Sequence, residues 1–535
     1  MDESSGHHGR RGLEARFSGL AAALLSGRDL ELLSPLRFLA PGALPEGAAP
    51  RVDRRALAAG LAVANAAYGH PRAAELAAKL ADPATAVVAT GQQTGLLGGP
   101  LLGLVKAAAA VRYAEALEAR GRPAVAIFWM ATEDHDYAEV ASAAFPGPEG
   151  VVELALGADP QPLMPVGMRS LGAGVEPVFT RLAELYPNER FALWRERLAA
   201  WWRPDARFGE AFARQLAATF GGRAPLVLDA MLPELKQAER PHLARLVERR
   251  FELDAAFAER EAEIARRAHA HQVAPQPGVS PLFLLAGLER RRIAWVGASS
   301  FALRGVEGER SVAELLETID GNPAVVSPGA LARPAIQDAV LGTTLQVMGP
   351  GEIGYLAQAA AVYPLLGIAA PETALRPQAL VLDARSAEHL AELGVGLQEL
   401  IADPAGAERR LGERAGGGFV EPAAAAVGAA LAGLEAPAVA LDPTLAKPFE
   451  KTRETVARAL EAFAGKVAAA AARRDEQTAR RFAALRDLVA PAGGAQERTL
   501  SAAYFPGRYG DGFGAALLDQ LELDPSRLSV VDPHR

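Results

Sequence analysis

The sequence predicts an α/β protein with a Rossmann-like parallel-sheet core, inserted helical segments and a C-terminal α-helical coiled coil. Near the N-terminus, the apolar run Ala86–Ala89, a glycine-rich segment and the Ala- and Leu-rich Leu101–Ala119 follow one another. This is the strand, turn and helix that open a Rossmann unit. Pro123–Ala131 is almost wholly apolar and short, as expected for a strand buried on both faces of a parallel sheet. Phe449–Val489 has apolar residues at helical spacing and no proline.

The glycine-rich segment predicts a binding site for an anion. Its candidate binding residues are Gly91, Gln92, Gln93, Thr94, Gly95, Gly98 and Gly99. Backbone N–H groups at the start of the following helix could hold a phosphate or a carboxylate. The pattern is neither GxGxxG nor a Walker A loop, so a tight turn that needs glycine for steric reasons is the alternative.

An acidic cluster follows the second predicted strand and supplies the candidate catalytic residues Glu133, Asp134, His135 and Asp136. In open α/β sheets, ligands bind beyond the carboxyl ends of the strands, where the glycine segment would also lie. Charged groups placed together repel one another and cost desolvation if they are buried. We therefore interpret the cluster as a site for an amine, a metal or nucleotide hydroxyls; capping of the next helix is the alternative.

A third polar segment follows the apolar stretch Leu345–Met348. Gly349 and Gly351 make a turn, and Glu352 and Tyr355 then share one helix face at i, i+3 spacing. Glu352 either caps the helix or binds a substrate amine or acts as a base. Lys106, in the helix after the glycine segment, is either a surface lysine or a phosphate clamp.

The remaining elements divide the chain into a catalytic core at 1–380, a helical coiled-coil domain at 381–490 and a tail at 491–535. Two helical insertions, at about 151–223 and 235–275, interrupt the core. The second begins as one long charged helix, Leu235–His271. The predicted later strands are Ala224–Met231, Arg291–Gly297 and Pro323–Ser327.

The C-terminal third is predicted to be helical, with candidates at Ala387–Ile401, Ala423–Leu434 and Phe449–Val489. A helix as long as the last cannot bury one face against a small domain, so an antiparallel coiled coil or a dimer interface is its natural use. The aromatic residues of the tail are expected to dock it on the body; they are Phe505, Tyr509 and Phe513.

Composition narrows the function classes. A net charge of −8 argues against a broad surface for nucleic acid. Every apolar segment of membrane-spanning length has charges or glycine and proline breaks, and Met1–Arg11 lacks the apolar core of a secretory signal. We therefore expect a cytoplasmic protein with no membrane partner, whose His7 and His8 lie in a frayed arm. The absence of cysteine excludes a catalytic thiol, disulfides and a thiolate zinc site.

Four segments together resemble the cysteine-adding enzyme family of bacillithiol biosynthesis. They are GQQTGLLGGPLLGLVKA, FWMATEDHDYAEV, SPGALARPAIQDAVLGTTLQVMGPGEIGYLAQ and PAGGAQER, with Tyr509-Gly510 after the last. The third contains Arg333-Pro334, Gln337-Asp338 and the GPGE run with Tyr355. The family usually continues with proline-arginine-x-serine, where this chain reads Leu375-Arg376-Pro377-Gln378; Arg376 is carried over as a candidate binding residue.

The resemblance implies a ligase that joins L-cysteine to the amine of glucosaminyl malate, and a homodimer formed through the coiled coil. Amide formation in water needs an activated carboxyl group, so we expect ATP or another nucleotide as co-substrate and infer no metal. Two alternatives stay open at this stage. One is a metal-dependent hydrolase that uses Asp134, His135 and Asp136 as ligands, and the other is a non-catalytic nucleotide-binding scaffold.

Overall fold

The computed structural model describes residues 17–48, 50–274, 276–414, 419–474 and 476–535. The predicted arm with His7 and His8 lies outside these residues. The chain forms two compact units. The first comprises the described residues of Met1–Phe145, Glu153–Val381 and Glu497–Arg535, and the second comprises those of Pro146–Val152 and Leu382–Gln496.

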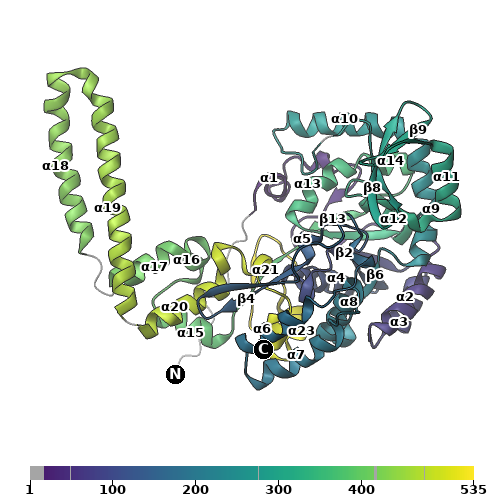
Figure 1. Ribbon diagram of the computed structural model, residues 1–535, viewed down its shortest axis with the longest axis horizontal. Helices are drawn as coiled ribbons and strands as arrows, with labels where there is room; N and C mark the ends of the chain where they lie inside the picture. Colours follow the sequence, from purple (N-terminus) through teal and green to yellow (C-terminus); the bar gives the residue numbers. More distant parts are fainter. Residues whose placement is uncertain (1–16, 49, 275, 415–418, 475) are drawn as a thin grey trace. The chain divides into compact units, whose positions relative to one another are not determined.

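A six-stranded parallel sheet forms the centre of the first unit, as the sequence predicts (Figure 1). Its strand order is β1-β13-β12-β2-β3-β6, and neighbouring strands run parallel. From β2 the chain continues to β3 and β6 on one side, then returns to β12 and β13 on the other. The strands are β1 (Arg37–Phe38), β2 (Ala86–Gln92), β3 (Ala124–Met130), β6 (Leu226–Asp229), β12 (Thr343–Met348) and β13 (Glu372–Leu375).

Helices cover both faces of this sheet, which explains why β2 and β3 are apolar throughout. Val87 and Ile127 pack in one core with α2 (Arg55–Ala67) and α3 (Ala73–Ala81). Side chains alternate between the faces of a strand, so Val88 and Phe128 project to the opposite face. There α4 (Leu102–Glu118) packs on β2 and β3.

A second sheet in the first unit is antiparallel, with the order β10-β9-β8-β7-β11. Its strands are β7 (Val279–Ala286), β8 (Glu289–Val296), β9 (Ser300–Leu303), β10 (Glu309–Ser311) and β11 (Val326–Pro328). The predicted strands at 291–297 and 323–327 therefore belong here and not to the parallel sheet. The antiparallel sheet contributes side chains to the cavity described below.

The other helices of the first unit are short or of ordinary length. They are α1 (Gly19–Leu25), α5 (Tyr137–Val140), α6 (Val175–Leu185), α7 (Glu189–Trp201), α8 (Phe208–Phe220), α9 (Pro233–Glu248), α10 (Arg250–Arg266), α11 (Val312–Gly321), α12 (Arg333–Leu341), α13 (Pro350–Ala359), α14 (Val362–Leu366), α22 (Tyr504–Tyr509) and α23 (Phe513–Gln520). The C-terminal segment also adds a strand to this unit, because β15 (Leu528–Val531) pairs with β14 (Gln378–Val381).

Two local predictions were wrong. The insertion at 151–223 is not wholly helical, because β5 (Gly150–Ala155) pairs with β4 (Ser142–Gly147) before α6 begins. The long helix expected at 235–271 is two helices, α9 and α10, separated at Arg249. Charged residues occur on both sides of Arg249, so the pattern of charged and apolar residues does not show where the first helix ends.

The second unit is helical and contains a helix hairpin (Figure 1). In the hairpin, α18 (Val420–Leu441) packs along α19 (Ala446–Arg474), and a short turn at Pro443–Leu445 joins them. The predicted helix at 449–489 is thus shared between α19 and α20 (Glu476–Val489). The remaining helices here are α15 (Ala384–Glu392), α16 (Leu397–Ala402) and α17 (Pro404–Gly412), and α21 (Gln496–Thr499) spans the unit boundary.

Helix α18 is apolar, although it contains the charges and the glycine and proline breaks that the sequence analysis noted for such segments. Among the described residues it is long and apolar enough to cross a membrane, judged by length and composition alone. No residue in the most apolar stretch of this helix is buried by the rest of the chain.

Candidate active site

A cavity of about 810 Å³ lies at the carboxyl edge of the parallel sheet. Residues at the ends of three neighbouring strands line it, namely Gly91 and Gln92 at the end of β2, Glu133 after β3 and Gly349 after β12. The strand order reverses between β2 and β12, and open α/β sheets bind their ligands at such a reversal. Helix α10 and the antiparallel sheet supply further lining residues, which include Asp254, Phe257, Glu261, Phe283, Arg290 and Arg292.

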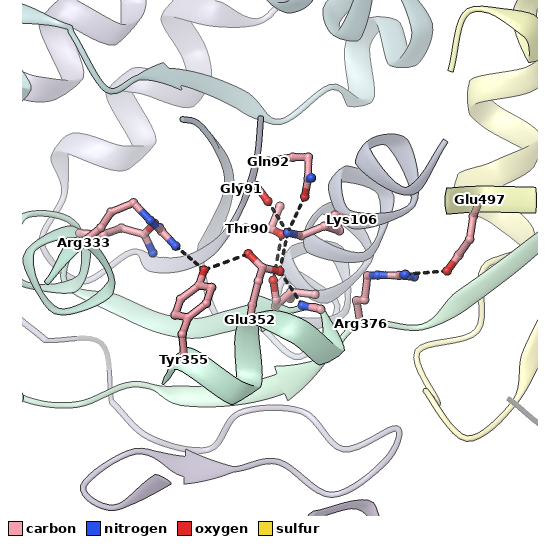
Figure 2. Close-up of polar contacts among 12 residues, drawn as sticks. Thr90, Gly91, Gln92, Lys106, Arg333, Glu352, Tyr355, Arg376 and Glu497 are labelled. Carbon is pink, nitrogen blue, oxygen red and sulfur yellow. Dashed lines mark hydrogen bonds and ion pairs between the residues drawn. The ribbon is translucent and has the colours of Figure 1, made fainter. Parts of the chain in front are cut away.

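A buried lysine connects the end of β2 with the start of α13 at the cavity (Figure 2). Lys106, on α4, is 1% exposed, and its ammonium donates to the carbonyl of Gly91 and to Oε1 of Gln92 at 3.2 Å. It also forms an ion pair with Glu352 at 2.5 Å. Three protein acceptors thus occupy the three N–H groups of the ammonium. Lys106 is therefore not the surface lysine considered from sequence; it holds Gln92 and Glu352 in place.

Glu352 is both a helix cap and a wall of the cavity. Its Oε2 accepts the backbone N–H of Gly349 at 2.6 Å, and the Tyr355 hydroxyl lies 3.4 Å from Oε1. Burial alone would raise the pKa of Glu352, but the Lys106 ammonium and the Gly349 N–H outweigh it and hold that pKa below its usual value. Glu352 is therefore a carboxylate at neutral pH.

Two arginines flank Glu352 (Figure 2). Arg333, at the start of α12, donates to the Tyr355 hydroxyl at 2.8 Å and to Gln337 at 3.0 Å. Arg376, which follows β13, is 1% exposed and pairs with Glu497 at 2.6 Å. Both line the cavity, so this side of it is rich in cations held in fixed positions.

The opposite side contains the first part of the acidic cluster. Asp134 accepts a hydrogen bond from Gln93 Nε2 at 2.7 Å and lies 3.4 Å from an Arg290 nitrogen. Arg290 lies over the Phe283 ring and approaches His135 Nδ1 at 3.4 Å. Burial and the Arg290 charge lower the pKa of His135, so its imidazole is held toward the neutral form.

Asp136 is placed differently from the rest of the cluster. It is exposed, does not line the cavity and caps α5 by accepting the Glu139 backbone N–H at 3.2 Å. For this residue the structure shows the capping role that the sequence left as an alternative. Among the described residues, no group of three His, Cys, Asp or Glu side chains could hold a metal ion, so the hydrolase alternative has no ligand set there.

The later residues of the glycine-rich segment lie outside the cavity. Thr94, Gly95, Gly98 and Gly99 do not line the cavity. A Cβ on Gly95 would lie 2.7 Å from the Gly99 Cα, and one on Gly98 would lie 2.4 Å from the Gln215 amide. These glycines permit close backbone packing, and Gly98 and Gly99 have φ values of +87° and +63°. Only Gly91, Gln92 and Gln93 of this segment reach the cavity.

The glycines of the third segment do reach it. Gly349 and Gly351 line the cavity at the start of α13. A Cβ on Gly351 would meet nothing within 4 Å, so the space beside this backbone is open.

Sequence reasoning missed several residues of the site. Arg290, Arg292 and Phe283 come from the antiparallel sheet, and Lys236, on α9, forms an ion pair with Glu133 at 2.6 Å. Arg498 lines the cavity from the C-terminal segment. The three consecutive arginines at 290–292 were the available signal, but an alternating strand gives no indication of which face meets the site.

Comparison with known proteins identifies the class to which this fold and site belong. Residues 43–377 match the model of the bacillithiol biosynthesis BshC N-terminal Rossmann-like domain, and residues 379–531 match that of the BshC C-terminal coiled-coil domain. The predicted fold class is thereby confirmed. The chain belongs to the BshC family of bacillithiol biosynthesis.

Relatives from three bacteria support this family membership. A protein of Solibacter usitatus is 32% identical over 88% of each chain, and one of Salinibacter ruber is 30% identical over 84% of each. One of Thermus thermophilus is 30% identical over 83% of this chain and 91% of its own. Each of the three is named "Putative cysteine ligase BshC".

The Lys106–Glu352 pair gives a prediction about stability. Lys106→Met should lower the free energy of unfolding in urea by about 3 kcal/mol, because it leaves a carboxylate without its ammonium. Since the pKa of Glu352 is lowered, its ionised carboxylate stabilises the protein at neutral pH, and this contribution is lost as acidification passes through that pKa.

The matched control is Lys79→Met, which removes a partly exposed ion pair with Glu118 and should cost at most about 1 kcal/mol. The double variant Lys106→Met/Glu352→Gln should recover part of the loss. If Lys106→Met and Lys79→Met lower the free energy of unfolding by equal amounts, the structural role assigned to Lys106 is contradicted.

Proposed function

We propose that this protein joins the carboxyl group of L-cysteine to the amino group of glucosaminyl malate in an amide bond. One observation carries the proposal: a single cavity at the strand-order reversal is lined by both arginines and carboxylates. Glucosaminyl malate has two carboxylates and one amine, and L-cysteine adds a carboxylate and an amine. Family membership and the names of the relatives support the same substrate class.

The arginines and the carboxylates of the cavity suit the two kinds of substrate group. Arg292 and Arg498, together with Arg333 and Arg376, offer guanidinium donors that match carboxylates in geometry. Glu133 and Asp134 can orient an ammonium group and help to remove its proton. A cavity of this size also falls within the range of small-molecule sites.

We further propose a nucleotide as the activating co-substrate, because a free carboxylate does not form an amide in water without activation. Cleavage of a phosphoanhydride would supply the driving force. The turn from Gly95 to Gly99 does not fit a phosphate, since its glycines are packed against backbone and Gln215. The arginines of the cavity have the donor chemistry that phosphate oxygens require.

The proposal is tested by incubating the purified protein with L-cysteine, glucosaminyl malate and ATP and analysing the products by mass spectrometry. The expected product is the cysteinyl amide, formed only when all three compounds are present. Product formation without a nucleotide would contradict the activation step, and hydrolysis of glucosaminyl malate without amide formation would contradict the ligase.

The acidic cluster supplies a matched pair of variants. Asp134→Asn should lower turnover at least about tenfold, because Asp134 lies in the cavity between Gln93 and Arg290. Asp136→Asn should leave turnover and melting temperature nearly unchanged, since Asp136 lies outside the cavity and Asn also caps helices well. Similar losses of turnover in the two variants would contradict the assignment of Asp134, and not Asp136, to the active site.

We also propose that the protein is a homodimer formed through the helix hairpin. On α18, Val427, Leu434 and Leu441 recur at intervals of seven residues and are 38%, 58% and 84% exposed. A neighbouring row that includes Leu431 is less exposed. A coiled coil buries both apolar rows of a heptad, so a second chain would cover the exposed row. This would also keep the apolar helix away from water in a cytoplasmic protein.

Light scattering tests the dimer. The intact protein should have the mass of two chains, and Leu434→Glu should give a folded monomer because it puts a charge into the covered row. Ala429→Glu adds the same charge to an exposed position on another face and should stay dimeric. A monomeric intact protein, or one that binds lipid vesicles through α18, would contradict the dimer.

A further inference from the structure

A group of three charged side chains lies behind one wall of the cavity. Lys236, on α9, contacts an oxygen of Glu133 and an oxygen of Glu239, each at 2.6 Å. The side chains of Lys236 and Glu239 are 2% and 0% exposed. Glu133 is 11% exposed and lines the cavity. Of the three, only Glu133 can therefore touch a substrate.

The group has one positive charge for two carboxylates. Fully ionised, it would bury a net charge of −1, which is costly in a site shielded from water. Glu239 Oε1 is buried and has no hydrogen-bond partner among the described residues. A buried carboxylate oxygen without a donor adds to that cost, and one added proton would relieve both problems.

The electrostatics agree with this charge count. Burial raises the pKa of Glu239 to about 7, although Lys236 opposes the rise, and the nearby Glu133 carboxylate adds to it. These two residues are the charged groups that act on Glu239, and Arg290 also faces Glu133. The group as a whole is thus balanced near neutral pH between holding one extra proton and lacking it.

We propose that Glu133 is the base that takes the proton from the substrate amine, and that Glu239 stores this proton by way of Lys236. The inference rests on the proposed ligase activity. The ammonium group of the substrate passes one proton to Glu133. Lys236 then passes one of its own protons to Glu239 and takes the proton from Glu133. The amine keeps its electron pair for attack, Glu133 is again a carboxylate, and Lys236 is again an ammonium.

The arrangement requires no movement of heavy atoms, because Lys236 Nζ is already within hydrogen-bond distance of both carboxylates. Glu239 and Lys236 are positioning residues that act through Glu133. Their burial behind the wall keeps the stored proton away from the solvent during the reaction. After the product leaves, the proton returns through Lys236 to Glu133, which lines the cavity and releases it to water.

The test compares pH profiles of kcat/KM for the wild type and Glu239→Gln. In the wild type, the rate should rise with pH about an apparent pKa near 7, because the base must be free of the extra proton. Glu239→Gln removes the acceptor behind Lys236 and, with it, the group that titrates near pH 7. The midpoint of the rise in kcat/KM should therefore move away from pH 7 by more than about one unit, and the plateau of kcat/KM should fall at least about tenfold.

The control is Glu248→Gln, an exposed carboxylate on the same helix, which should leave the profile unchanged. A Glu239→Gln profile with the wild-type midpoint would overturn the proposal, even if its plateau fell, since a purely structural role predicts that result.

A second measurement needs no activity. Infrared difference titration of the folded wild type should show a protonated carboxylic acid that ionises near pH 7, above the ordinary range of Glu. Asp338 is a second buried carboxyl group, with a pKa raised to about 6, so the band is assigned to Glu239 by its loss in Glu239→Gln. The absence of such a band would overturn the proposal that Glu239 stores a proton. Because this readout needs no substrate, failure of the ligase assay and failure of the proton store can be told apart.

Discussion

The ion pair between Lys106 and Glu352 is the constraint on which the rest of the site depends. Lys106 lies on the helix that follows β2, and Glu352 lies on the helix that follows β12. The pair thus joins the two strands between which the strand order reverses. Because the Lys106 ammonium also holds the Gly91 carbonyl and the Gln92 amide, it fixes the end of β2 against the start of α13. The Tyr355 and Arg333 side chains are positioned in turn through Glu352.

The opposite wall is organised by the same physical rule, that a buried charge must have a partner. Arg290 bonds Ser327 and the Pro328 carbonyl and thereby faces Asp134 and His135 at a fixed position. Lys236 holds Glu133 from behind. The cavity therefore has polar groups whose orientations are set before any substrate arrives, which lowers the reorganisation needed during reaction.

Much of the fold could be predicted because buried parallel strands have a simple signature. The apolar runs at β2 and β3 and the polar residues after them gave the sheet edge and with it Gln92, Glu133 and Asp134. Asp136 could not be separated from its neighbours, because the direction of each side chain in a turn depends on tertiary contacts. Glycine that permits close packing also looks the same in sequence as glycine that borders a cavity, as Gly95 and Gly351 show. Lys236 and Arg290 meet the site only through contacts between elements far apart in the chain.

Gly351→Val tests most directly whether this cavity is the active site. Space beside Gly351 is open, so valine should take up part of the cavity beside α13 without disturbing the fold. Gly321→Val places the same side chain in open space outside the cavity and serves as the control. With both variants folded, as shown by unchanged melting temperatures, we predict loss of amide formation for Gly351→Val and wild-type rates for Gly321→Val. Wild-type activity in a folded Gly351→Val protein would contradict the assignment of this cavity as the active site.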